Sequence, residues 1–96
     1  MSKHLKLTDA QILTLRRMYI GTRYFMRGDK QKGEQDKLSH RVNCPSIPVL
    51  FREGLVNWRN PACKKFDGLY YGVNLTPSGF DAVVEGKTSK ERQHDN

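Results

Sequence analysis

The first apolar positions that recur along the chain have the spacing of an amphipathic helix. They fall into two neighbouring stripes, Ile12, Leu15 and Tyr19 in one, and Leu13, Ile20 and Tyr24 in the other. Thr8 and Gln11 form a capping-box pattern in front of these stripes. Gly21 weakens the helix without ending it, and Gly28 is the better stop signal. The pattern therefore predicts a first helix that begins after Thr8 and extends towards Gly28.

The chain that follows this helix is polar. Residues 28–37 contain no apolar side chain, which predicts a solvated loop. Residues 38–42 then predict a short segment of one or two helical turns. Pro45 and Pro48 come next, and prolines are tolerated in a helix only in its first turn. We therefore expect a short helix over about 47–53, with Ile47, Leu50 and Phe51 on its apolar side and Gly54 at its end.

Two β-rich runs follow, at residues 55–59 and 69–75. The segment between them, residues 60–68, contains a proline, a glycine and two lysines. This arrangement predicts an antiparallel hairpin with an extended basic tip. Thr76 is then suited to cap a last helix with Pro77 at its first position, and Gly86 ends that helix.

The length of the chain limits it to one domain. It has 96 residues, so a multidomain enzyme is excluded. The elements predict a basic lead at 1–7, a single domain at 8–86 and a disordered tail at 87–96, which has no apolar residue. No apolar run approaches the length of a membrane span, and residues 1–6 lack an apolar signal core. We therefore expect a cytoplasmic protein without membrane contact.

The charge of the chain is high and uneven. The formal net charge is +7. Residues 1–66 hold 14 Lys and Arg against 5 Asp and Glu, whereas residues 67–96 hold 3 against 5. A small basic domain of this kind favours nucleic acid or an acidic protein surface as its partner, with solubility alone as the alternative explanation.

Candidate chemistry is sparse. The sequence has no glycine-rich phosphate loop, no nucleophile signature and no paired carboxylates, so we predict neither catalysis nor a cofactor. Cys44 and Cys63 are too few for a disulfide framework and are expected to be free thiols. A metal site would have to gather His40 with both cysteines, and it would still lack a fourth ligand. We predict no metal.

Three segments in order resemble the pattern of winged helix-turn-helix domains, especially MarR-like and PadR-like regulators and their small phage relatives. Residues 7–11 have the form L-T-x-x-Q, residues 50–56 resemble the L-x-x-x-G-L-V join between recognition helix and wing, and residues 75–79 resemble the L-T-x-x-G that follows the wing. The resemblance covers about residues 5–86. It implies a small α+β fold, with a helical core and a two-stranded antiparallel wing.

The resemblance also implies a function and a site. The family places its recognition helix, here about 45–53, in the major groove of double-stranded DNA, and the tip of its wing along the backbone or in the minor groove. We therefore expect a small transcriptional regulator that is a monomer or a homodimer. The residues that this implies for nucleic-acid binding are Arg41, Ser46, Val49, Arg52, Arg59, Lys64 and Lys65.

Departures from the family pattern motivate an alternative function. The second helix is reduced to about 38–43, the recognition helix contains Pro48, and Arg52 is its one basic residue. Backbone contact is therefore better supported than base reading. The alternative is a protein-binding module, such as a phage-encoded inhibitor whose basic face meets an acidic partner in a host protein or nucleoprotein complex.

Several aromatic and basic residues allow two interpretations. Trp58, Tyr70 and Tyr71 on neighbouring strands favour cross-strand core packing, with stacking on bases as the alternative. Phe66 near the wing tip either contacts a partner or folds back onto the sheet. Four arginines, Arg16, Arg17, Arg23 and Arg27, form the solvated side of the first helix or extend a basic strip.

Overall fold

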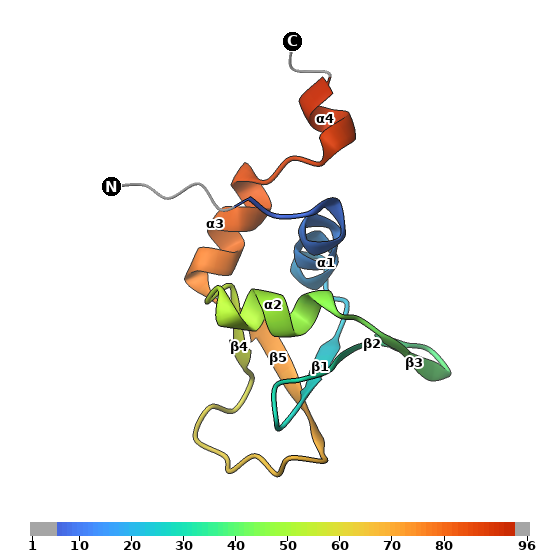
Figure 1. Ribbon diagram of the computed structural model, residues 1–96, viewed down its shortest axis with the longest axis vertical. Helices are drawn as coiled ribbons and strands as arrows, with labels where there is room; N and C mark the ends of the chain where they lie inside the picture. Colours follow the sequence, from blue (N-terminus) through green and yellow to red (C-terminus); the bar gives the residue numbers. More distant parts are fainter. Residues whose placement is uncertain (1–5, 94–96) are drawn as a thin grey trace.

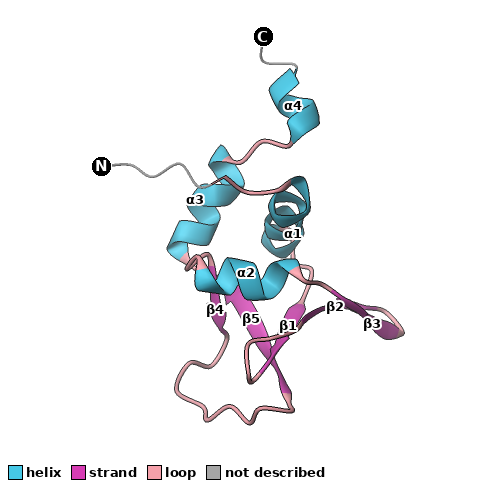
Figure 2. Cartoon of the chain, viewed as in Figure 1, coloured by secondary structure: helices cyan, strands magenta, loops and turns pink. Residues whose placement is uncertain are grey.

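In the computed structural model, which describes residues 6–93, three helices gather on one side of a five-stranded antiparallel sheet (Figure 1). The strand order is β3-β2-β1-β5-β4, and a fourth short helix extends beyond α1 (Figure 2). The elements are α1 (Asp9–Tyr19), β1 (Tyr24–Arg27), β2 (Gly33–Lys37), β3 (His40–Asn43), α2 (Ser46–Arg52), β4 (Val56–Trp58), β5 (Tyr70–Leu75), α3 (Pro77–Glu85) and α4 (Ser89–Gln93).

The start of α1 follows the predicted capping box. The Gln11 N–H donates to the Thr8 hydroxyl at 3.2 Å, and the Thr8 N–H donates to the Gln11 side chain at 3.0 Å. The predicted end of the helix is wrong. Gly21 adopts a left-handed φ of +109°, which turns the chain out of the helix. Tyr24 consequently lies on β1, where its side chain is fully buried.

The largest departure from the sequence-based expectation is the β2–β3 hairpin. Residues 28–37 are not a loop throughout, and the predicted helical turns at 38–43 do not form. Instead, Glu34 pairs with Asn43 and Lys37 pairs with His40, while β2 also pairs with β1. The predicted winged helix-turn-helix fold is therefore wrong. The chain forms a five-stranded sheet rather than a two-stranded wing, and residues expected to form the second helix form strand β3 instead.

The C-terminal half follows its local signals more closely. β4 and β5 form the predicted antiparallel pair, although β5 also pairs with β1. The Thr76 hydroxyl accepts from the Gly79 N–H at 3.0 Å and donates to the Gly54 carbonyl at 2.7 Å, so one residue caps α3 and fixes the turn after α2. The sequence predicts a disordered tail at 87–96, whereas Ser89–Gln93 form α4. Residues 94–96 of that tail and residues 1–5 of the basic lead lie outside the described residues.

The core lies between the helices and one face of the sheet. Two buried clusters form it, Leu15, Leu50, Leu55 and Val56 in one, and Tyr24, Met26, Ile47 and Val73 in the other. Phe51 and Met18 pack against both clusters. Gly33 lets α2 approach β2, since a Cβ atom at residue 33 would lie 2.5 Å from the Ile47 Cβ. This side of the sheet is therefore closed by packing.

The opposite side, which we call the outer face, carries the alternate residues of each strand. Phe25 on β1 and Gly72 on β5 belong to it, because their neighbours Tyr24 and Val73 point into the core. In the described chain no outer-face side chain is buried, so no helix packs over this face.

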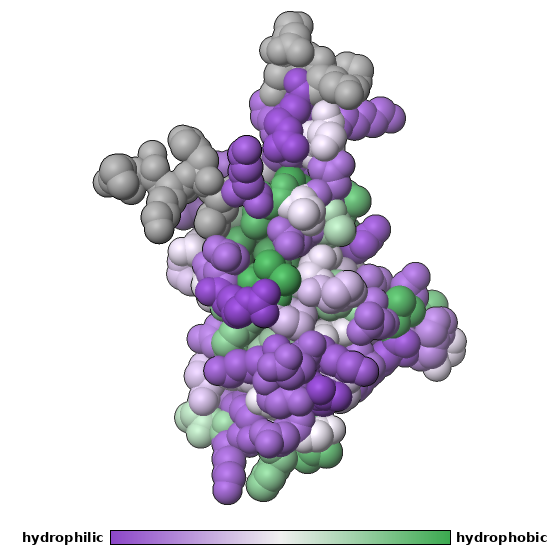
Figure 3. Space-filling view, viewed as in Figure 1, coloured by the Kyte–Doolittle hydropathy of each residue, from purple (hydrophilic) through white to green (hydrophobic). Residues whose placement is uncertain are grey.

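Exposed apolar groups lie elsewhere on the molecule. In the view of Figure 3 they gather between α1 and α3 and near the tip of the β2–β3 hairpin, where Leu38 is fully exposed. None of the helices in residues 6–93 has the length and apolarity needed to cross a membrane.

Candidate nucleic-acid interface

The strand register aligns a row of residues across the outer face. Asn43, Glu34, Phe25 and Gly72 are successive cross-strand partners on β3, β2, β1 and β5. The Arg59 N–H donates to the Gly72 carbonyl at 2.9 Å, which extends the row to the end of β4. The row therefore crosses the whole sheet, from one edge to the other.

The Arg59 side chain lies over Gly72, the neighbouring member of this row. A Cβ atom at residue 72 would stand 2.5 Å from the Arg59 Nη1 and 2.6 Å from its Cζ, so the guanidinium occupies the space that Gly72 leaves open. The Arg59 Nε also donates to the Asn74 side-chain oxygen at 3.4 Å. The sheet thereby fixes a cation on its outer face.

A second guanidinium, that of Arg41 on the edge strand β3, is held over Phe25, the cross-strand partner of Gly72. The Arg41 Cζ lies over the Phe25 ring, 4.0 Å from its centroid. The Arg41 Nη1 is 3.7 Å from the Glu34 Oε1, and 44% of the Arg41 side chain remains exposed. The ring beneath and the carboxylate at its edge orient this guanidinium.

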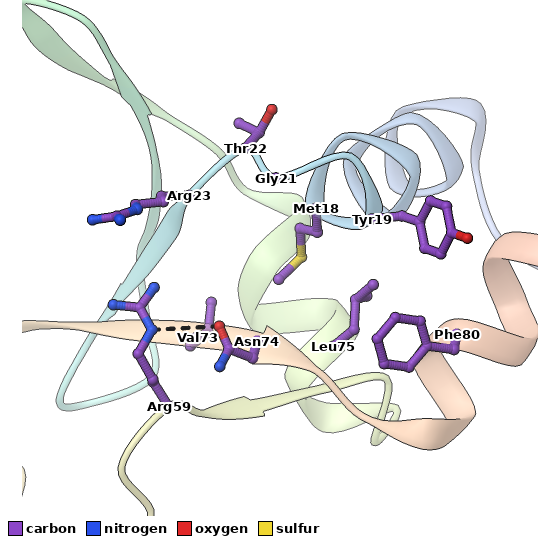
Figure 4. Close-up of a pocket in the computed structure, with 10 residues that line it drawn as sticks. All are labelled: Met18, Tyr19, Gly21, Thr22, Arg23, Arg59, Val73, Asn74, Leu75 and Phe80. Carbon is purple, nitrogen blue, oxygen red and sulfur yellow. Dashed lines mark hydrogen bonds between the residues drawn. The ribbon is translucent and has the colours of Figure 1, made fainter.

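An open cleft of about 560 Å³ adjoins Arg59 (Figure 4). Arg23 and Arg59 stand at one end, and the rings of Tyr19 and Phe80 stand at the other, packed edge to face with their centroids 6.1 Å apart. The remaining residues that line it are Met18, Gly21, Thr22, Val73, Asn74 and Leu75. The cleft thus combines two guanidinium groups with an aromatic wall.

The arginines of this region differ in how they are paired. The Arg27 Nη2 is 2.8 Å from the Asp29 Oδ2, and this hydrogen-bonded pair raises the pKa of the guanidinium and lowers that of the carboxyl. Arg41 has Glu34 as its neighbouring carboxylate. Arg23 and Arg59, in contrast, form no ion pair with any described residue. These two are the cations of the outer face that remain available to an anion.

We call Arg23, Phe25, Arg41 and Arg59 the outer strip. Two of its members, Arg41 and Arg59, belong to the site predicted from the sequence. Arg23 was predicted only as part of the solvated side of a helix or of a basic strip. Phe25 was not predicted, and neither was the Tyr19–Phe80 wall. The available signal was the alternation of Arg23, Phe25 and Arg27 with buried Tyr24 and Met26, which has the period of a strand.

The predicted recognition helix presents little to a ligand. Ser46 is buried at 8% exposure and Val49 is half-buried, so neither faces outward as expected. Both are covered because a helix of only seven residues packs most of its circumference against the core. Within α2, Arg52 alone is an exposed polar side chain.

The two predicted lysines lie on the β4–β5 loop. The Lys65 ammonium donates to the carbonyl oxygens of Asn60 and Cys63, and it lies 5.3 Å from the Trp58 ring centroid. The Lys65 ammonium is therefore hydrogen-bonded within the β4–β5 loop and stabilises the conformation of that loop. Lys64 is exposed, with its ammonium 5.2 Å from the Phe66 ring centroid.

Other predicted chemistry has a plain structural outcome. Trp58 packs between Phe51 and Tyr71, with ring centroids 5.2 and 5.9 Å away, on the core side of the sheet. Cys44 and Cys63 are free thiols. Residues 6–93 contain no group of three His, Cys, Asp or Glu side chains that could hold a metal ion.

No family model, curated protein or solved structure matches this chain. The interpretation of the outer strip therefore depends on its own geometry and charge. Both favour an anionic ligand on the outer face of the sheet.

Proposed function

We propose that this protein binds nucleic acid, and that the phosphate backbone contacts Arg23 and Arg59 on the outer face of the sheet. The observation that carries the proposal is the pair of guanidinium groups at the cleft, from Arg23 just before β1 and Arg59 just after β4, which form no ion pair with a carboxylate among the described residues. Guanidinium groups bind phosphate oxygens in a bidentate manner, and each neutralised phosphate releases its condensed counterions.

The surroundings of the pair support this assignment. The face is uncovered, and it carries the amide side chains of Asn57 and Asn74, both exposed. Amides contribute hydrogen bonds to phosphate and sugar without adding charge. The net charge of +7 adds long-range attraction towards a polyanion.

The proposal differs from the sequence-based expectation in where contact occurs. Duplex DNA remains the partner expected from the sequence, and its backbone offers the phosphates that the outer strip requires. Reading of bases by α2 has no support in this geometry, because α2 is largely buried. Binding to an acidic protein remains the alternative prediction.

A salt-dependent titration tests the proposal. Labelled duplex DNA is titrated by fluorescence anisotropy at about 50 and about 200 mM salt, with wild type, Arg59→Gln, Arg23→Gln and, as a matched control, Arg52→Gln. We expect binding that weakens with salt, and each outer-face variant should lower the slope of log K against log salt by about 0.9. Arg52→Gln should bind like wild type.

Two results would overturn the proposal. One is the absence of binding to both duplex and single-stranded DNA at the lower salt concentration, where counterion release helps most. The other is an Arg52→Gln variant that loses as much affinity as Arg59→Gln, since that would place the contact on α2. Trp58 packs in the core and reports folding of every variant by its fluorescence.

A further inference from the structure

The Arg41 guanidinium, stacked on Phe25, suits a flat and uncharged ligand group rather than the phosphate proposed for Arg59. Arg41 reaches from the edge strand β3 across β2 to cover an aromatic ring on β1. Its guanidinium has the ring on one side, and nearly half of the side chain is open to solvent. The protein thus displays a flat cationic surface that is already oriented before any ligand binds.

Acidic groups surround this stacked guanidinium. Glu34 lies 3.7 Å from its Nη1, and Asp36 is the cross-strand partner of Arg41 on β2. Asp36 also lies beside Arg23, because its N–H donates to the Arg23 carbonyl, so Glu34 is the carboxylate that distinguishes Arg41. The Glu34 carboxylate repels a phosphate that approaches Arg41, whereas it does not repel the uncharged face of a nucleobase. Arg23 and Arg59 form no ion pair among the described residues, so the phosphate-binding and base-binding positions of the strip are distinct.

The spacing of these positions fits one polynucleotide strand. Arg59 and Arg41 extend from opposite edges of the sheet, but their guanidinium groups lie over Gly72 and Phe25, which are direct cross-strand partners about 5 Å apart. That spacing places a phosphate on Arg59 and a base on Arg41 within the same or adjacent nucleotides of one strand, whose stacked repeat is about 3.4 Å.

We propose that Arg41, supported by Phe25, stacks on an unpaired base, so that the protein prefers single-stranded nucleic acid. This inference rests on the proposed function, because the phosphates of the same strand contact Arg23 and Arg59. Unpaired bases expose their faces to guanidinium planes and aromatic rings, whereas bases inside a duplex are covered by their neighbours. Stacking of this kind tolerates any base sequence.

The test compares strand state and side-chain shape at constant charge. Labelled oligothymidylate and oligouridylate of about 12 nucleotides are titrated at about 50 mM salt beside a duplex of the same length. We expect at least one single strand to bind at least about fivefold more tightly than the duplex. Arg41→Lys keeps the charge and loses the planar surface, so it should abolish that preference while leaving the salt slope unchanged.

A second variant addresses the support beneath Arg41. Phe25→Leu removes the ring and should reduce single-strand affinity as Arg41→Lys does. Its matched control is Phe51→Leu, which alters a half-buried aromatic on the core side and should leave the preference intact. Arg41 is exposed, so the Arg41→Lys result does not depend on how well Phe25→Leu folds.

The outcomes separate this inference from the proposed function. Stacking of a base on Arg41 is overturned if the wild type binds duplex and single strands equally, or if Arg41→Lys retains the wild-type preference. Neither result contradicts phosphate binding by Arg23 and Arg59. Absence of binding to every oligonucleotide overturns both. The inference is supported if the wild type prefers a single strand, if Arg41→Lys and Phe25→Leu both remove that preference, and if Phe51→Leu keeps it.

Discussion

The Arg59 guanidinium fills the space above Gly72 on the neighbouring strand β5. A Cβ atom at residue 72 would stand 2.5 to 2.9 Å from three atoms of that guanidinium. Gly72 has an ordinary backbone conformation, so the glycine is explained by this close approach rather than by its φ. The position of the cation thus depends on the absence of a side chain one strand away.

The Gly72→Ala substitution tests this dependence without changing a charge. The added methyl group displaces only the end of a flexible side chain, so we expect the stability to change by less than about 1 kcal/mol. Nucleic-acid affinity should fall by about two- to tenfold, because the guanidinium leaves its position. Anisotropy titration and thermal unfolding measure the two quantities. Unchanged affinity in Gly72→Ala would show that the position of Arg59 does not matter.

Gly33 offers a test of the β2–β3 hairpin, the part of the fold that the sequence did not predict. A Cβ atom at residue 33 would lie 2.5 Å from the Ile47 Cβ and 2.8 Å from the Cys44 carbonyl oxygen. Gly33→Ala should therefore reduce the free energy of unfolding by about 1–3 kcal/mol through overpacking. Denaturant unfolding followed by Trp58 fluorescence gives the value.

The control for this substitution is Gly68→Ala, where a Cβ atom would meet nothing within 4 Å. Its φ lies outside the left-handed region, so the change should be nearly neutral. If residues 28–37 were a solvated loop, both glycine variants would behave alike. Equal stability of the two variants would contradict the packing of α2 on β2.

Docking of α4 on α1 should depend on pH. The Arg16 Nη1 donates to the Glu91 carboxylate at 2.8 Å, and the Arg16 Nη2 donates to the Gly86 carbonyl at 2.9 Å. The hydrogen bond with Arg16, helped by the Thr88 N–H, lowers the pKa of Glu91 to about 2 from its ordinary value of 4.5. Because the folded-state pKa is depressed, the contact stabilises α4 above the ordinary pKa and weakens as the pH falls towards about 2.

Amide hydrogen exchange or NMR shifts of residues 88–92 measure this dependence. We expect α4 to remain docked at pH 5 and to lose protection progressively as the pH falls towards about 2. The Glu91→Gln variant should show weak docking at every pH, with no such transition. A wild-type transition that Glu91→Gln retains would assign the effect to another carboxyl group.

The sequence predicted those elements whose signals are local. Thr8 and Thr76 mark helix starts through hydrogen bonds to residues three positions away, and both caps form. Gly54 marks the end of α2 with a φ of +77°. β2 and β3 carry almost no apolar residues, so no periodicity indicates them, and their pairing with β1 comes from residues distant in the chain.

In the candidate site too, single residues could be predicted from the sequence, but their contacts between strands could not. Arg41 and Arg59 were predicted as phosphate contacts through a resemblance to a fold that the chain does not adopt. Their partners Phe25 and Gly72 were missed, because the contacts that define them join different strands. Tyr24 fits the apolar stripe of the predicted first helix, so strand β1, with Phe25 on it and Arg23 just before it, was not predicted. A pattern within one element does not report which face of a sheet remains uncovered.

The most direct test of nucleic-acid binding by the outer strip is an NMR titration of the isotope-labelled protein with an oligonucleotide. Contact at the outer strip predicts that the largest shifts occur at amides of Arg23, Phe25, Gly72 and Asn74, with α2 unaffected. Perturbations confined to Val49–Arg52 and to the β4–β5 loop would instead place the contact on the recognition helix and wing tip expected from the sequence. That result would contradict binding through the outer face of the sheet.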